Sequence, residues 1–222
     1  MEVNTGRKRE TYHHGSLRDE LVEACVRLIE TEGIGAVSLR RVAREAGVSP
    51  GAPYHHFPDR AALLSAIAAR GFGLLTQDLL AAVGTSPGGP SSPGVAGASG
   101  ADDVSRAVAA YVAFARRRPG HFQVMFRPEL SEPEKHPDLR EAGDGALDVL
   151  TDLVGRLGVA DPHAMGITLW ALGHGLASLT LDGPLEQKAA TWGTTSDDLL
   201  ARAIGQIGRS LGVTPERDTA AP

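Results

Sequence analysis

The segment 38–57 reads SLRRVAREAGVSPGAPYHHF, and it decides how the rest of the chain is interpreted. Its first half has the apolar spacing of a short helix that Gly47 ends. The apolar positions on one face of that helix are Leu39, Val42, Ala43 and Ala46. Its second half begins with Ser49 at a cap position and Pro50 in the first turn, where a missing N–H costs nothing. A helix, a tight turn with a glycine and a second helix form the helix-turn-helix pattern of DNA-binding proteins.

The second helix of this pattern is poor in core-forming residues and rich in groups that can touch an external surface. Ser49, Gly51 and Ala52 are small enough to let its N-terminus enter a groove, where free N–H groups suit phosphate oxygens. Three polar aromatic side chains and one large apolar residue follow: Tyr54, His55, His56 and Phe57. Nearby arginines can neutralise phosphate: Arg40, Arg41, Arg44 and Arg60. The segment therefore predicts a recognition helix.

Helical spacing also governs the rest of the chain, and no alternating run of useful length predicts a strand. The expected helices span residues 16–32, 59–83, 102–118, 137–157 and 161–181, and a last one begins at 196. Residues 84–101, GTSPGGPSSPGVAGASGA, have no charged or aromatic group and predict a flexible loop. We expect an all-α fold with an N-terminal three-helix helix-turn-helix DNA-binding domain and a helical C-terminal domain.

Composition limits the class of protein. The 222 residues carry a net charge of −5, to which residues 1–60 contribute nothing because their basic and acidic residues balance. The N-terminus is polar and no run of about eighteen apolar residues occurs, so we expect neither a secretory signal nor a membrane span. The one cysteine, Cys25, lies on the apolar face of a predicted helix and indicates a buried thiol in a reducing compartment. We expect a cytoplasmic protein.

Residues 12–67 resemble the DNA-binding domain of the TetR family of transcriptional regulators. The motifs that carry the resemblance are GAVSLRRVA at 35–43 and AGVSPGAPYHHFPDRAALL at 46–64. The resemblance implies a DNA-binding domain at 12–72 and a DNA-backbone contact by Arg60 after the Phe-Pro turn. It also implies DNA contacts by Ser38, Arg40, Ser49, Gly51, Ala52, Tyr54, His55 and His56. At 52–54 the chain has A-P-Y where the family more often has T-L-Y.

The segment WALGHGLA at 170–177 resembles the W-x-x-x-H-G signature of one C-terminal subgroup of the same family. Trp170 and His174 lie four residues apart and so share a helix face, whether in the core or toward a ligand. Gly173 and Gly175 inside a predicted helix indicate a close approach of another helix or a ligand. The family's C-terminal domain usually holds a small-molecule pocket, which implies a ligand-binding and dimerisation domain at 102–212. The candidate ligand-binding residues are Tyr111, Phe122, Met125, Phe126, Trp170 and His174.

The final predicted helix has an apolar stripe with no other obvious cover: Leu199, Leu200, Ala203, Ile204, Ile207 and Leu211. A two-fold interface with the Trp170 helix of a second copy would bury that stripe. Together with the resemblance, this indicates a ligand-responsive repressor that binds a palindromic operator as a homodimer.

Other classes of protein fit the sequence less well. The adjacent histidine pairs 13–14 and 55–56 lie about 100° apart on a helix and cannot bind one metal as an i, i+4 pair does. A formal G-x-S-x-G match at 84–88 lacks the strand that a nucleophile elbow needs before it. We therefore expect no enzyme, cofactor or metal site. The alternative function is a helical protein-interaction module that has lost DNA binding.

Overall fold

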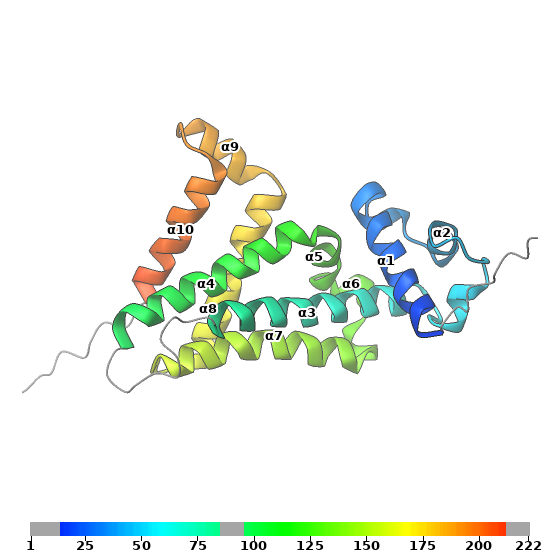
Figure 1. Cartoon of the computed structure of the whole chain (residues 1–222), viewed down its shortest axis with the longest axis horizontal. Coiled ribbons are helices and arrows are strands. Elements are labelled where there is room, and N and C mark those ends of the chain that lie inside the picture. Colours follow the sequence, from blue (N-terminus) through cyan, green and yellow to red (C-terminus); the bar gives the residue numbers. More distant parts are fainter. Residues whose placement is uncertain (1–13, 85–95, 212–222) are drawn as a thin grey trace, which may run out of the picture.

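A computed structural model of the chain describes residues 14–84 and 96–211 (Figure 1). Every regular element in those two ranges is a helix, which confirms the all-α prediction. With η marking a 3-10 helix, the elements are α1 (His14–Glu32), η1 (Ile34–Ala36), α2 (Leu39–Glu45), η2 (Ala52–His55), α3 (Arg60–Gly84), α4 (Ala96–Arg117), α5 (Pro119–Met125), α6 (Pro128–Ser131), η3 (Pro133–Lys135), α7 (Pro137–Arg156), α8 (Pro162–Leu181), α9 (Pro184–Thr191) and α10 (Ser196–Leu211).

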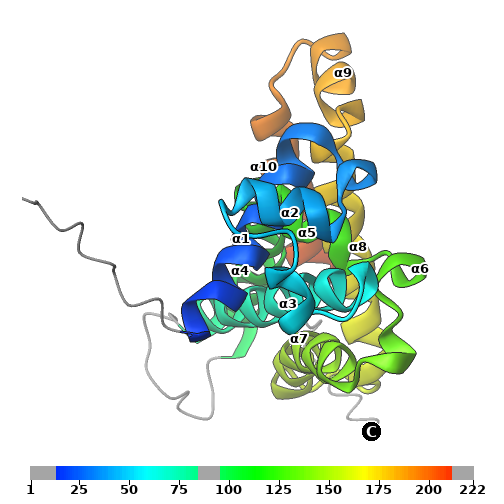
Figure 2. The ribbon, with the colours of Figure 1, turned by 90° about the vertical axis from the view of Figure 1, so that its right-hand side faces the viewer.

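The elements α1, α2 and η2 gather at one end of the molecule around the start of α3, as the view onto that end shows (Figure 2). Their apolar faces meet in a core that includes Leu21, Cys25, Ile29, Val42, Phe57, Leu63 and Ile67. Burial raises the pKa of the Cys25 thiol to about 12, so this thiol stays protonated. The spacing read from the sequence therefore identifies the faces that form this core.

Helix α3 is shared between the two halves of the chain. Its first turns bury Leu63, Leu64 and Ile67 with α1, and its last turns bury Leu75 and Leu79 between α4 and α7 (Figure 1). By length and composition alone, both α3 and α8 would be apolar enough to cross a membrane. The buried leucines of α3 give its apolar character a different explanation, because they form the core of a helical protein.

Helix α8 crosses and packs against both α4 and α7, and the short helix α9 joins it to α10, which packs on α4 (Figure 1). The prediction that the stripe on α10 has no cover within its own chain is wrong in part, because α10 packs on α4. Leu200 is 8% exposed there, and Ile204 and Ile207 pack against the same core. Helix α8 instead leaves large apolar side chains exposed: Ile167, Trp170, Leu172, Leu179 and Leu181.

The start of one helix and the presence of others differ from what the sequence predicts. Helix α4 begins at Ala96, so residues 96–101 of the predicted loop 84–101 are helical, and residues 85–95 lie outside the described ranges. The buried Gly100 lies so close to Leu157 that a tertiary contact overrides the weak helix propensity of this segment. Helix α5 is not among the expected helices; Pro119 stands in its first turn, where the missing N–H costs nothing. Helix α9 was not predicted.

Candidate DNA-binding surface and ligand cavity

The turn between α2 and η2 follows from local chemistry. Ser38 caps α2, because its Oγ accepts a hydrogen bond from the Arg41 backbone N–H at 3.2 Å. Gly47 has a positive φ of 70°, which lets the chain leave α2 in a left-handed conformation. The Val48 N–H then donates to the Ala43 carbonyl at 2.9 Å. Backbone hydrogen bonds thus close the predicted helix-turn-helix.

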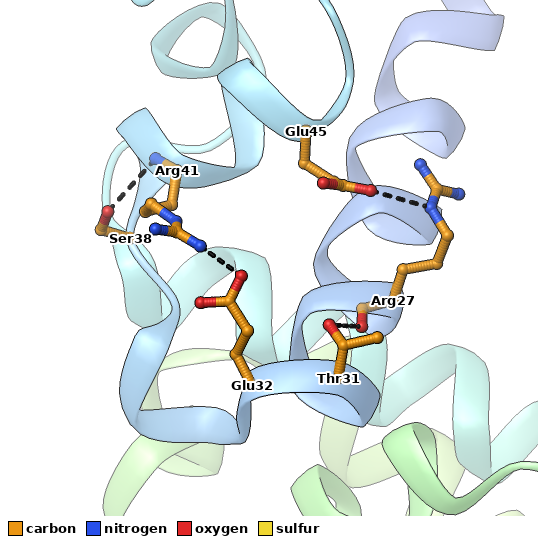
Figure 3. A network of polar contacts seen from close by, with 6 residues as sticks. All are labelled: Arg27, Thr31, Glu32, Ser38, Arg41 and Glu45. Carbon is orange, nitrogen blue, oxygen red and sulfur yellow. Dashed lines mark hydrogen bonds and ion pairs between the residues drawn. The ribbon is translucent and has the colours of Figure 1, made fainter.

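Two ion pairs hold α2 across α1 (Figure 3). Arg27 Nε lies 3.3 Å from Glu45 Oε1, and the Arg41 guanidinium pairs with the Glu32 carboxylate. Each pair is partly exposed and contributes little stability, so the pairs add to the packing of α2 on α1 and do not determine it. The charge of Arg41 is therefore paired with a carboxylate of the same chain. Arg40 is exposed and has no ion-pair partner in the part of the chain that the structure describes.

The second element of the motif is a 3-10 turn rather than an α-helix. Its hydrogen bonds run from residue i+3 to residue i: the Tyr54 N–H donates to the Gly51 carbonyl at 3.2 Å, and the His56 N–H to Pro53 at 3.0 Å. Pro50 and Pro53 have no N–H, so a regular α-helical ladder cannot form across this segment. The predicted recognition helix is thus shorter and tighter than an α-helix.

The outer surface of α2 and η2 is polar and open to solvent. Its exposed residues are Ser38, Arg40, Arg44, Ser49, Gly51, Tyr54 and His55, and Ala52 and His56 are half-buried. Tyr54 is 52% exposed, so its hydroxyl can reach an external partner. Pro53 is buried and cannot touch a base, whereas Phe57, at 2% exposure, anchors the turn to the core. Except for Arg60, all the predicted DNA-contact residues lie on this surface.

Arg60 faces inward instead. Its Nε donates to the Val37 carbonyl at 3.0 Å and its Nη2 donates to the Ile34 carbonyl at 2.8 Å. The side chain is half-buried and ties the start of α3 to the loop before α2. Two of its three guanidinium nitrogens are thereby used inside the protein, and a contact between Arg60 and DNA stays a prediction.

Helix α5 joins this unit to the rest of the molecule. At its start, the Gly120 N–H donates to Glu30 Oε1 of α1 at 3.1 Å. A Cβ at Gly120 would lie 2.9 Å from the Glu30 Cγ, and a Cβ at Gly71 of α3 would lie 2.6 Å from the Met125 Sδ. Because the two glycines have no side chain, α5 can pack closely against both α1 and α3: the Glu30 side chain lies against the backbone of Gly120, and the Met125 side chain lies against the backbone of Gly71.

His121 lies inside this junction, with 6% of its surface exposed. Neither ring nitrogen has a hydrogen-bond partner among the described residues. Burial lowers the pKa of His121, and the nearby Arg70 and Arg118 act in the same direction, while Glu23 and Glu30 oppose them. The imidazole is therefore held neutral between α1, α3 and α5.

At the other end of α5 lies an apolar cavity of about 400 Å³. Four of the predicted ligand-binding residues line it: Tyr111, Met125, Phe126 and Trp170. Its other walls come from α3 and α7, among them Phe72, Leu75, Leu79, Leu139, Ala146 and Leu150. The sequence did not identify these residues as part of a site, since helical spacing cannot tell a side chain that borders a cavity from one that fills it.

A chain of hydrogen bonds forms one wall of the cavity. The Trp170 Nε1–H donates to the Tyr111 hydroxyl oxygen at 3.2 Å, and that oxygen lies 3.3 Å from His174 Nδ1. A Cβ at Gly173 would lie 3.2 Å from the Tyr111 ring, so this glycine lets α8 approach α4 closely. The sequence left open whether Trp170 and His174 face the core or a ligand. Both residues form hydrogen bonds with the buried Tyr111, and Trp170 also borders the cavity.

Phe122 and His174 lie behind this wall. Their rings stack with centroids 5.3 Å apart, and Phe126 contacts His174 edge-on at 4.5 Å. They border a second hollow of about 320 Å³, which is polar and also includes Arg127 and Asp182. Of the six predicted ligand-binding residues, these two therefore support the cavity from outside rather than line it.

The comparison with protein families agrees with both halves of this geometry. Residues 21–67 match the family model described as "Bacterial regulatory proteins, tetR family". Residues 104–207 match the one described as "Tetracyclin repressor-like, C-terminal domain". The chain belongs to the TetR family. This TetR-family protein is accordingly a transcriptional regulator with a helix-turn-helix DNA-binding domain.

Individual relatives agree. The HTH-type transcriptional regulator BetI of Rhizobium meliloti (strain 1021) is 39% identical over 66 residues, which are 30% of this chain and 32% of that protein. The match thus spans about a third of the length of that curated relative. A solved protein of unknown function from Rhodococcus sp. RHA1 is 30% identical, with a TM-score of 0.73 over 92% of this chain and 100% of that chain. A regulatory protein of the tetR family from Rhodococcus RHA1 has 21% identity and a TM-score of 0.63, covering 89% and 97%, and shares the fold.

The inward position of Arg60 leads to a prediction about stability. Arg60→Ala should lower the free energy of unfolding of this TetR-family protein by about 1–3 kcal/mol, because two carbonyls lose their charged donor. Chemical denaturation measures the change. Arg44→Ala is the matched control, because Arg44 is exposed and makes no ion pair within residues 14–84 and 96–211. If the two variants are equally stable and both bind DNA weakly, Arg60 acts at the DNA backbone instead.

His121 should make stability depend on pH. The pKa of His121 in the folded state lies below the ordinary value of 6.5. As the pH falls, the imidazole is therefore protonated more readily in the unfolded chain than in the folded protein. The stabilisation is therefore present above pH 6.5 and is lost as the pH falls further. In urea denaturation from about pH 8 to about pH 5, His121→Leu should lose less stability than the unmodified protein. His163→Leu, at an exposed histidine of α8, is the control. Equal slopes for all three proteins would contradict the prediction.

Proposed function

We propose that this TetR-family regulator is a ligand-responsive repressor that binds a near-palindromic operator as a homodimer. In this proposal residues 12–72 form the DNA-binding domain, residues 102–212 form the ligand-binding and dimerisation domain, and α3 connects them. The observation that carries the proposal is the position of α5, which contacts α1 at one end and lines the cavity at the other.

The coupling runs through that short helix. A ligand in the cavity touches Met125 and Phe126, so it favours whichever position of α5 suits its shape. Because the Gly120 N–H donates a hydrogen bond to the Glu30 carboxylate, a shift of α5 moves α1 with it. The movement of α1 changes the spacing of the two DNA-binding domains in the dimer. Coupling free energies between such sites are typically about 1–3 kcal/mol, enough to change operator affinity by one to two orders of magnitude.

The exposed apolar face of α8 supports the homodimer. Leu172 and Leu179 are 37% and 45% exposed and lie two turns apart on one side of α8. Large apolar patches of this kind on a soluble protein mark contact surfaces. A two-fold axis beside α8 and α10 would bury this face against its copy and would present two helix-turn-helix units to successive major grooves.

DNA binding should depend on Tyr54. Tyr54→Ala should weaken binding to DNA from upstream of the chain's own gene by about tenfold or more, since a lost groove contact costs about 1–3 kcal/mol. A gel-shift titration at constant salt measures the effect. Leu80→Ala is the matched control, because Leu80 is also 52% exposed but lies on α3, away from the motif. Unchanged binding by Tyr54→Ala would place the DNA contacts elsewhere, whereas absence of binding by the unmodified protein would favour the interaction-module alternative.

Dimerisation should depend on α8. The double variant Leu172→Glu with Leu179→Glu should sediment as a monomer and bind the operator weakly, because four carboxylates cannot be buried at the two-fold axis. Leu80→Glu introduces the same charge at an exposed leucine of α3 and should leave the dimer intact. Sedimentation velocity distinguishes the two species. A double variant that remains dimeric would exclude this face of α8 from the interface.

A further inference from the structure

We infer that the ligand of the apolar cavity is an uncharged, mostly apolar molecule with one hydrogen-bond donor, an alcohol or a phenol, whose O–H donates to the Tyr111 oxygen. The inference rests on the proposed function, because it takes this cavity as the effector site. It adds the chemical class of the effector, which follows from the hydrogen bonds among Trp170, Tyr111 and His174.

The direction of these hydrogen bonds can be worked out from the groups present. The indole nitrogen of Trp170 can only donate, so the Tyr111 oxygen accepts its hydrogen bond. Tyr111 is 2% exposed, and a buried hydroxyl needs an acceptor for its own proton. His174 Nδ1, at 3.3 Å, is the one acceptor within reach of that hydroxyl in the described part of the chain. Tyr111 therefore donates to Nδ1, and His174 carries its proton on Nε2.

In this arrangement the Tyr111 hydroxyl can still accept a hydrogen bond but has no proton left to donate. A phenolic oxygen has one O–H to donate and two lone pairs that accept. The O–H is used by His174 and one lone pair by Trp170, so a single acceptor position is left. A ligand that offers an O–H can use this position, whereas a ligand with only acceptor groups, such as an ether, cannot.

The charge of the cavity excludes ionic ligands. Burial raises the pKa of the Tyr111 hydroxyl well above its usual range and lowers the pKa of His174, so both groups are neutral at ordinary pH. The charged residues that border the cavity, Arg140 and Asp144, are exposed, opposite in sign and one turn apart on α7. An ion inside the apolar chamber would lose its hydration, and the opposite charges of Arg140 and Asp144 give it no net counter-charge.

The remaining walls suit a compact ring or a short alkyl chain. Phe72 and Phe126 meet edge-on with ring centroids 5.3 Å apart, and the indole of Trp170 lies 6.1 Å from Phe126. Rings arranged in this way favour edge and offset contacts with a further aromatic group. A volume of about 400 Å³ lies within the usual range for small-molecule sites and accommodates an alkylated ring.

The test compares four probes of nearly equal size by calorimetric titration of the full chain: para-butylphenol, butylbenzene, para-butylanisole and para-butylbenzoate. The phenol should bind about five- to tenfold more tightly than butylbenzene or the anisole, and the benzoate should not bind. In Tyr111→Phe the advantage of the phenol should fall below about twofold, while butylbenzene binds as before. The retained butylbenzene affinity shows that the variant still folds around its cavity.

A second variant locates the binding. Leu147→Trp fills the cavity from α7 and should abolish binding of all the probes that bind to the unmodified protein. The inference is overturned if the benzoate binds at least as tightly as the phenol, if the anisole equals it, if Tyr111→Phe keeps the preference, if Leu147→Trp still binds, or if no probe binds.

Gel shifts in the presence of each bound probe separate this inference from the proposed function. Release of operator DNA by the benzoate alone would leave the ligand-responsive repressor standing and remove the alcohol or phenol class. Preferential binding of the phenol without any change in DNA affinity would support the ligand class and contradict the ligand-responsive function.

Discussion

Helix α5 cannot shift without disturbing α1 and α3, because glycines let it pack closely against both helices. Gly120 brings its start onto Glu30 of α1, and Gly71 brings its end onto α3 through Met125. Packed interfaces of this kind switch between discrete arrangements rather than deforming smoothly. Besides the shared helix α3, the chain therefore joins its DNA-binding unit to its cavity through about two turns of α5, and His121 is buried at that junction.

The charges near the DNA-binding surface are divided between two tasks. Arg41 pairs with Glu32, and Arg60 holds the carbonyls that precede α2, so these two arginines build the motif. Arg40 and Arg44 remain exposed on its outer surface, where they can neutralise phosphate. This division lets a chain with a net charge of −5 present a locally basic surface, because its acidic excess lies beyond residue 60.

The cavity and the proposed dimer face share one helix. On α8, Trp170 borders the cavity and is also 36% exposed, while Leu172 and Leu179 face outward. Gly173 lets this helix lie close against Tyr111 of α4. In the proposed function, a change at the cavity wall would be transmitted to two places: to α1 through α5, and to the outer face of α8. Ligand, partner subunit and DNA would then act on one connected set of helices.

The sequence by itself determined the long helices, the Gly47 turn and the polar face around Tyr54, because these follow from spacing and backbone chemistry within a few residues. It predicted a second helix that tolerates Pro50 in its first turn, and not the 3-10 turn that forms at Ala52–His55. Only the tertiary structure decided that Arg60 turns inward, that Phe122 supports the cavity rather than lining it, and that residues far apart in α3 and α7 enclose an open space. Those outcomes depend on how distant helices pack, and the periodicity of one helix carries no information about the shape of the surface it meets.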